Sequence, residues 1–340
     1  MATMRSVVLK APIAGLPQPG DFTFAQSDIP ALDDHQFLIE HRIASVDPGV
    51  RSRLSATGAS YAPPIPPGER IDGFVVGQVT ESRNTRYPVG SWVTASGGWG
   101  SHSISDGRGY ILPLSDNGLP RSLWLGILGI PGMTSWFGLK RVGQMREGAH
   151  VLVTSAAGVV GATAGQLARA WGAASVVGIA GGQDKCDWLV SECGFDAAID
   201  YKAVDDLDAA IAAACPKGVD ILFDNVGNAM VDRVLPMMRL NGHIIVSGQV
   251  ADYNVPLSER AGITNTGEFI AKRLTMRGIL VFDDIPQFAA AQAEMGAMIA
   301  DGTLVYREEM FEGLEAMPEA FCGLFTGASF GRRLVRLGDY

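Results

Sequence analysis

The chain has 340 residues, 47% hydrophobic and 19% charged, which is enough apolar sequence for large cores and suggests two domains rather than one. Its formal net charge of −9 argues against a general nucleic-acid or anionic-membrane surface, since both partners require a basic field. The four cysteines are scattered without C-x-x-C spacing, so they indicate neither a disulfide framework nor a zinc cage.

The first third of the chain has a β-rich pattern. Residues 1–6 lack the apolar stretch of a signal peptide, so we expect a cytoplasmic protein. Short apolar runs then alternate with Pro, Gly and Asn, which predicts a small barrel or sandwich. The expected strands are Val7–Lys10, Phe37–Ala44, Phe74–Thr80, Ser91–Ala95 and Tyr110–Leu112.

The pattern changes near Leu123. The segment 123–139 is uncharged, but it is short for a membrane span and broken by Gly and Pro, so we expect it in a core. Apolar strands then alternate with helices, which indicates a doubly wound parallel sheet that binds ligands beyond the carboxyl ends of its strands. The expected strands are Val151–Thr154, Ser175–Ile179, Ala197–Asp200, Ile221–Asn225 and His243–Ser247.

A glycine turn follows the first of these strands. Ala156, Gly158 and Gly161 match G-x-G-x-x-G with alanine in the first place, and Gln166–Trp171 continues as an amphipathic helix. Gly158 lets backbone amides approach a pyrophosphate, and Gly161 lets the helix pack tightly against the strand. The alternative is a plain turn before a buried helix.

The ends of the next strands carry further candidate cofactor contacts. No acidic residue stands at the tip of the second strand to hold a ribose 2′-hydroxyl, and Lys185 lies nearby, which fits the 2′-phosphate of NADP. Tyr201 has a phenol that reaches a phosphate, while Asn225 and Gly227 place an amide and bare backbone near the middle of the cofactor. A solvated lysine and ordinary turn residues are the alternatives.

The C-terminal part is expected to contain a helix, a late sheet strand and a return to the first domain. Phe288–Ile299 has helical apolar spacing, with methionines that fill a core. Leu274–Phe282 reads as a strand, and Arg333–Leu337 as the last strand, which rejoins the first domain.

Several motifs in one order resemble a known family. They are Val46–Pro48, Trp99–Gly107, Gly129–Thr134, the glycine turn, Val176–Gly181, Asp200–Lys202 and Asp224–Gly227. Together they are similar to the zinc-independent medium-chain dehydrogenase/reductases, in particular to leukotriene B4 dehydrogenase, prostaglandin reductase, plant double-bond reductases and bacterial curcumin reductases. The resemblance covers almost the whole chain.

This resemblance implies a GroES-like catalytic domain over residues 1–122 and 300–340 and a Rossmann NADPH-binding domain over residues 123–299. An edge strand of the second domain would pair with its copy in a homodimer. The implied cofactor contacts are Met133, Thr134, Ala157, Gly158, Val159, Val160, Gly181, Lys185, Tyr201, Asn225, Gly227, Ser247, Gly248, Val250, Tyr253, Ile279, Leu280, Val281 and Ser329.

The departures from the family concern substrate and proton handling. Gly49 and Ala271 stand where relatives have tyrosines, and Ser329 stands where they have an asparagine. Zinc-dependent relatives use an early cysteine and a Gly-His-Glu segment, whereas no cysteine precedes Cys186 here, so no metal is expected.

The chemistry that fits is reduction of the C=C bond of α,β-unsaturated ketones and aldehydes, with hydride transfer to the β-carbon. Tyr253 is the candidate hydrogen-bond donor, and Arg51, Tyr61 and Trp99 are candidate substrate contacts, with aromatic packing as the alternative for Trp99 and Tyr253. His102 is more typical of packing than of acid catalysis. A quinone reductase and a non-catalytic NADPH-binding protein remain as alternative functions.

Overall fold

The computed structural model describes residues 2–55, 62–114, 116 and 118–340 and divides the chain into two compact units. The first unit comprises Met1–Leu125, Glu308–Ser329 and Arg333–Tyr340, and the second comprises Gly126–Arg307 and Phe330–Arg332. Each unit therefore contains a segment from the C-terminal part of the chain.

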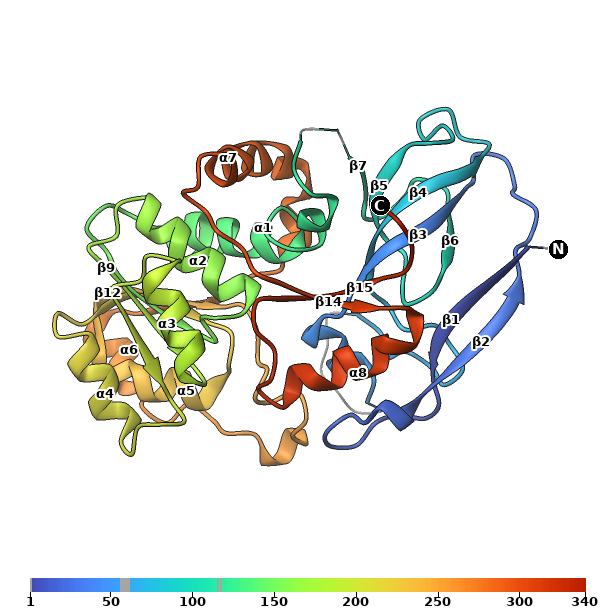
Figure 1. The fold of residues 1–340 in the computed structure, drawn as a ribbon. Helices are drawn as coiled ribbons and strands as arrows, with labels where there is room; N and C mark the ends of the chain where they lie inside the picture. Colours follow the sequence, from blue (N-terminus) through green and yellow to red (C-terminus); the bar gives the residue numbers. More distant parts are fainter. Residues whose placement is uncertain (1, 56–61, 115, 117) are drawn as a thin grey trace. The chain divides into compact units, whose positions relative to one another are not determined.

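The first unit is built on antiparallel strands (Figure 1). Its larger sheet has the order β14-β15-β3-β4-β5-β7, with β6 paired to β3, while β1 and β2 form a separate hairpin. The strands are β1 (Thr3–Leu9), β2 (Phe22–Asp28), β3 (Phe37–Ser45), β4 (Phe74–Ser82), β5 (Trp92–Ser96), β6 (His102–Ser105), β7 (Ile111–Pro113), β14 (Glu308–Glu312) and β15 (Arg332–Arg336). This unit also contains the helix α8 (Met317–Cys322), between β14 and β15 in the chain.

An aromatic cluster forms part of the core of this unit. Trp99 is fully buried, and its ring centroid lies 5.7 Å from that of Phe22 and 5.2 Å from that of Phe321 on α8. His41 on β3 is also buried. Its Nδ1 lies 2.6 Å from the carbonyl oxygen of Gly100, so Nδ1 carries the proton, and Nε2 accepts a hydrogen bond from Ser103 Oγ at 2.8 Å.

The second unit is a doubly wound parallel sheet in the order β10-β9-β8-β11-β12-β13. This order confirms the predicted parallel-sheet fold. The strands are β8 (His150–Thr154), β9 (Ser175–Ala180), β10 (Ala197–Asp200), β11 (Val219–Asp224), β12 (Met238–Val246) and β13 (Thr275–Gly278). The helices are α1 (Ile130–Phe137), α2 (Val159–Ala170), α3 (Gln183–Ser191), α4 (Leu207–Ala214), α5 (Asn228–Val234), α6 (Gly267–Lys272) and α7 (Phe288–Ala300).

Apolar residues of the strands hold the helices to the sheet. Leu152, Val177 and Leu222 are buried in one cluster with Ile211 of α4 and Val231 of α5. Helix α2 follows β8 in the chain and contacts β8 and β9, and helix α3 follows β9 and contacts β9 and β10 (Figure 1). Because all six strands pair in parallel, their carboxyl ends meet at one edge of the sheet.

Some predicted elements differ in the structure. The strand expected over Leu274–Phe282 is limited to β13, because the chain enters a 3-10 helix at Val281–Gln287. Three strands of the described residues were not predicted, namely β2, β6 and β14, because most of their residues are polar and most are exposed or half-buried.

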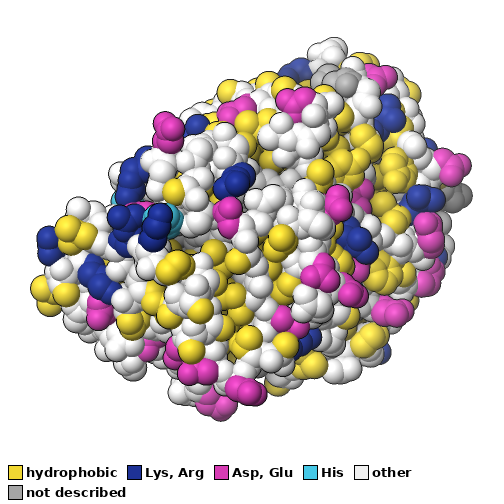
Figure 2. Space-filling model, turned by 60° about the vertical axis from the view of Figure 1, so that its left-hand side comes forward, with side chains coloured by type: hydrophobic (Ala, Val, Ile, Leu, Met, Phe, Trp, Pro, Cys, Tyr) yellow, Lys and Arg dark blue, Asp and Glu magenta, His cyan; other side chains and the backbone are white. Residues whose placement is uncertain are grey.

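The surface carries both charge signs. Figure 2 shows Lys and Arg side chains gathered beside a histidine on one part of the visible face, with Asp and Glu side chains spread over the remainder. Among the described residues, no helix has the length and apolar character that a membrane span requires.

Candidate dinucleotide-binding site

The glycine turn lies between β8 and α2. Gly158 precedes the first residue of α2, and no side chain among the described residues caps that helix. A Cβ built on Gly158 would meet nothing closer than the Ser155 carbonyl oxygen at 3.5 Å, whereas one on Gly161 would lie 2.6 Å from that oxygen. Gly161 is therefore required for packing, while Gly158 leaves open backbone at a helix N-terminus where an anion binds.

A C-terminal segment of the second unit joins this turn. The Gly331 amide donates to the Ala157 carbonyl oxygen at 2.9 Å, and Gly331 and Gly158 form a parallel bridge. Phe330 packs its ring centroid 5.2 Å from Trp188 of α3, and the Arg307 guanidinium lies 4.1 Å above the same ring. The motif spacing gave no signal for this contact, although the resemblance pointed to the neighbouring Ser329.

The ends of β9 and β10 form a corner with basic side chains. Gly181 follows β9, and a Cβ there would lie 2.7 Å from Tyr201 Cε1 and 2.9 Å from Lys202 Cε. Lys185 is half-buried in the first turn of α3, and Tyr201 is exposed. The structure thus brings together the candidates for the 2′-phosphate and adds Lys202. The sequence could have indicated Lys202, because it directly follows the candidate Tyr201.

Asp200, at the end of β10, is also part of this corner. Its Oδ1 accepts hydrogen bonds from the amides of Gly182 at 2.8 Å and Lys202 at 3.0 Å. The Gly182 hydrogen bond is the largest of the effects that lower the pKa of Asp200, and the charges of Lys202 and Lys185 act in the same direction. The carboxylate therefore carries a full negative charge at neutral pH.

A hydrogen-bond network fixes the loop after β11. Thr154 Oγ1 donates to Asp224 Oδ1 at 2.7 Å, and the Asn225 side-chain amide donates to the Thr154 carbonyl oxygen at 2.8 Å. Asp224 also accepts from the Val226 and Gly227 amides. Burial raises the pKa of Asp224 to about 6 despite these hydrogen bonds. The network holds Asn225 and Gly227 at the edge of the sheet.

The loop after β12 lies against the loop after β11. The Ser247 amide donates to the Asp224 carbonyl oxygen at 2.8 Å, and the Val250 amide donates to that of Asn225 at 3.2 Å. Tyr253 Oη accepts a hydrogen bond from the Gln249 amide at 3.4 Å. Burial raises the pKa of Tyr253, so its hydroxyl keeps its proton at neutral pH. Gly248 lies in the same loop, and a Cβ built on it would lie 3.2 Å from the Asn225 carbonyl oxygen.

The remaining predicted cofactor contacts are distributed along the second unit, with one exception. Met133 and Thr134 are on α1, where Ser135 donates to the Val160 carbonyl oxygen at 2.7 Å. Ile279 follows β13 and donates from its amide to the Val246 carbonyl oxygen at 3.1 Å. The exception, Ser329, belongs to the first unit. The others lie in the first turn of α2 (Val159, Val160) and after β13 (Leu280, exposed; Val281, buried).

The predicted substrate contacts are in the first unit or outside the described residues. The buried Arg51 donates to the carbonyl oxygens of Ile13 at 3.2 Å and Gly15 at 2.7 Å. Trp99 lies in the aromatic core described above, which corresponds to its packing alternative. Tyr61 lies outside the described residues. His102 Nδ1 lies 2.9 Å from Ser101 Oγ, and burial lowers its pKa.

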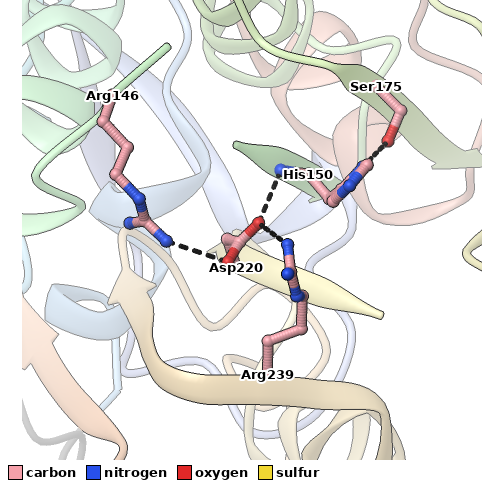
Figure 3. Close-up of polar contacts among 5 residues, drawn as sticks. All are labelled: Arg146, His150, Ser175, Asp220 and Arg239. Atoms are coloured by element: carbon pink, nitrogen blue, oxygen red, sulfur yellow. Dashed lines mark hydrogen bonds and ion pairs between the residues drawn. The ribbon is translucent and has the colours of Figure 1, made fainter. Parts of the chain in front are cut away.

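A second polar cluster is distant from this edge. Figure 3 shows Asp220 near the start of β11, with Arg146 on one oxygen and Arg239 on the other, each at 2.9 Å. The His150 amide, at the start of β8, donates to the same carboxylate, and His150 Nδ1 lies 2.7 Å from Ser175 Oγ. These residues join the amino ends of the strands, opposite the carboxyl ends that bear the candidate site.

Two family models match the chain. One, described as the N-terminal domain of oxidoreductase, matches residues 5–112, and the other, described as zinc-binding dehydrogenase, matches residues 159–296. Within the described residues, no group of three or more His, Cys, Asp or Glu side chains is arranged to hold a metal ion.

Curated proteins match over nearly full length. The chain is 37% identical to NADPH-dependent curcumin reductase of Escherichia coli (strain K12), over 98% of this chain and 97% of that protein. It is 36% identical to 2-alkenal reductase (NADP(+)-dependent) of Nicotiana tabacum, over 97% and 96%, respectively.

Solved structures match as well. The crystal structure of CurA in complex with NADPH from Vibrio vulnificus has a TM-score of 0.92 and 35% identity, covering 99% of this chain and 100% of that chain. The Escherichia coli quinone oxidoreductase complexed with NADPH has a TM-score of 0.78 at 19% identity, which shows a shared fold.

Proposed function

Because the chain belongs to the zinc-independent medium-chain dehydrogenase/reductase family of double-bond reductases, we propose that it uses NADPH to reduce the conjugated C=C bond of enones and enals. The observation that carries the proposal is the convergence of the glycine turn, the basic corner and the Asn225 loop at the carboxyl edge of one parallel sheet. Relatives named as NADPH- or NADP-dependent reductases support the same assignment.

The second unit fits a phosphorylated dinucleotide. The uncapped start of α2 beside Gly158 suits the pyrophosphate. The tip of β9 offers Ala180 and Gly181 rather than an acidic side chain, and Lys185, Tyr201 and Lys202 supply positive charge and a hydroxyl for a 2′-phosphate. We assign Asn225 and the loop after β12 to the nicotinamide half of the cofactor.

When bound, NADPH supplies a hydride that the β-carbon of the unsaturated carbonyl compound accepts. The residues of this chain bind and orient the reactants and stabilise the negative charge that develops on the carbonyl oxygen. Tyr253 suits that second task, because burial keeps its hydroxyl protonated and its oxygen already accepts from the Gln249 amide. Arg51 and Trp99 have no part in this proposal, since their side chains are buried within the first unit.

A panel of enals, enones and quinones assayed with NADPH tests the proposal. We expect loss of the nicotinamide absorbance band with enals and enones and formation of the saturated carbonyl product. Turnover of quinones alone would assign the chain to quinone reduction, and binding without any turnover would make it a non-catalytic NADPH-binding protein. Activity should survive chelators, whereas inactivation that zinc reverses would contradict the metal-free mechanism.

We also propose a cytoplasmic homodimer. All four cysteines lie in the described part of the chain and are free, which is typical of a reducing compartment. In the described sheet, β13 is a terminal strand with a mostly exposed face, which favours pairing with a second copy. Cell fractionation tests the location, and light scattering tests the dimer.

A further inference from the structure

One acidic side chain lies within the basic corner at the ends of β9 and β10. Asp200 pairs in register with Ala180, so the two strands end side by side. Its Oδ1 accepts from the Gly182 amide at the start of α3 and from the Lys202 amide. These two hydrogen bonds fix the carboxylate at the junction of both loops, where it cannot swing away from its neighbours.

The residues that surround it are those assigned to the 2′-phosphate. Gly181 faces the Tyr201 ring and the Lys202 stem, and Lys185 lies one helical turn from Gly182. The negative charge of Asp200 is close enough to the Lys185 and Lys202 ammonium groups for both to favour its ionised form. A carboxylate at this place therefore cancels part of the positive charge that a 2′-phosphate would meet.

The charge of Asp200 is not needed for its two hydrogen bonds, because a neutral amide oxygen of similar shape would accept from the same amides. We propose that Asp200 lowers the preference of this protein for NADPH over NADH by opposing the charges of Lys185 and Lys202. The inference rests on the cofactor placement given under the proposed function. Asp200 is thus a specificity-determining residue that weakens the hold on the phosphorylated cofactor.

Direct titration of Asp200→Asn by calorimetry tests the inference, with NADPH, NADH, 2′,5′-ADP and 5′-AMP as probes. We expect NADPH and 2′,5′-ADP to bind the Asp200→Asn protein about three- to tenfold more tightly than they bind the wild type at low ionic strength. The gain should shrink in high salt, because the effect is electrostatic. NADH and 5′-AMP should show no gain. Asp34→Asn, in an exposed turn of the first unit, is the control with the same change of charge.

Three outcomes would contradict the inference. They are unchanged or weaker 2′,5′-ADP binding by a folded Asp200→Asn protein, an equal gain for 5′-AMP, and an equal gain in Asp34→Asn. A thermal melt establishes folding, and Asp200→Ser, which keeps a small acceptor, replaces Asp200→Asn if that variant does not fold. A wild type that binds none of the four probes would instead overturn the cofactor placement itself.

Discussion

At the level of single residues, Lys185 offers a direct test of cofactor choice. Its ammonium group would make a charge-assisted hydrogen bond to the 2′-phosphate, worth about 1.5 to 3 kcal/mol. We expect Lys185→Ala to raise the KM for NADPH by roughly 10- to 150-fold and to change the KM for NADH much less. Steady-state kinetics with both cofactors measure this difference.

Lys217→Ala provides the matched control for that lysine. Lys217 is exposed just before β11, at the amino end of the strand, so its loss should affect neither cofactor. An equal rise in KM for NADPH and NADH in Lys185→Ala would remove Lys185 from the specificity role.

Tyr253 tests the catalytic half of the proposal. Replacing it with Phe removes the protonated hydroxyl and keeps the ring. If that hydroxyl stabilises the developing enolate, kcat for an enone should fall about 100-fold while the Kd for NADPH changes little. Tyr340→Phe, at an exposed tyrosine of the first unit, should leave kcat unchanged. Unaltered kcat in Tyr253→Phe would mean that another group, such as a ribose hydroxyl, supplies the hydrogen bond.

At the level of elements, the turn between β8 and α2 contains two glycines with different tasks. Gly158→Ala adds a methyl group that would lie 3.5 Å from the Ser155 carbonyl oxygen, an ordinary van der Waals contact, so the unfolding free energy should be preserved while the affinity for NADPH falls. Gly161→Ala places a methyl group against the Ser155 carbonyl oxygen and should lower the unfolding free energy by about 1 to 3 kcal/mol. Urea denaturation and NADPH titration of both variants separate binding from packing. If Gly158→Ala bound NADPH with the affinity of the wild type, the assignment of Gly158 to cofactor binding would be wrong.

The sequence predicts those features of the elements that depend on local pattern. The apolar runs predict β8, β9 and β10 to within one residue and β11 to within two, because buried parallel strands need continuous apolar sequence. Strand β12 begins five residues before the predicted start at His243, because its first part is largely exposed and gives no apolar run. The polar strands β2, β6 and β14 have no such signal. Contacts between distant segments also escape prediction, including Gly331 on Ala157 and the Thr154–Asp224 hydrogen bond, because they depend on the folded register. For the site, the sequence indicated Lys185 and Tyr201, whereas the arrangement of Asp200 required the structure.

At the level of the whole molecule, the proposed dimer depends on the free side of β13. The Ile279 amide donates to β12, so strand alternation turns the Gly278 amide toward the open side. Gly278→Pro removes that donor, and we expect light scattering to show a shift from twice 36.0 kDa to the monomer mass. Gly278→Ala keeps the amide and should remain dimeric. A wild type of monomer mass would rule the dimer out.

The neutral imidazole enclosed between Gly100 and Ser103 makes the molecule sensitive to acid. Burial, with a smaller effect from the Arg70 charge, lowers the pKa of His41 to about 3, whereas an unfolded chain protonates this group near pH 6.5. The stabilisation is therefore complete above pH 6.5 and declines as the pH falls toward 3. At pH 5 the contribution of His41 to the unfolding free energy should be about 2 kcal/mol smaller than at pH 7. Urea denaturation of the wild type and of His41→Gln at both pH values measures this change. The unfolding free energy should fall between pH 7 and pH 5 by about 2 kcal/mol more in the wild type than in His41→Gln.

A mildly acidic buffer would then destabilise the first unit through a side chain unrelated to hydride transfer. Activity lost at low pH would therefore reflect the stability of the fold as well as the titration of catalytic groups.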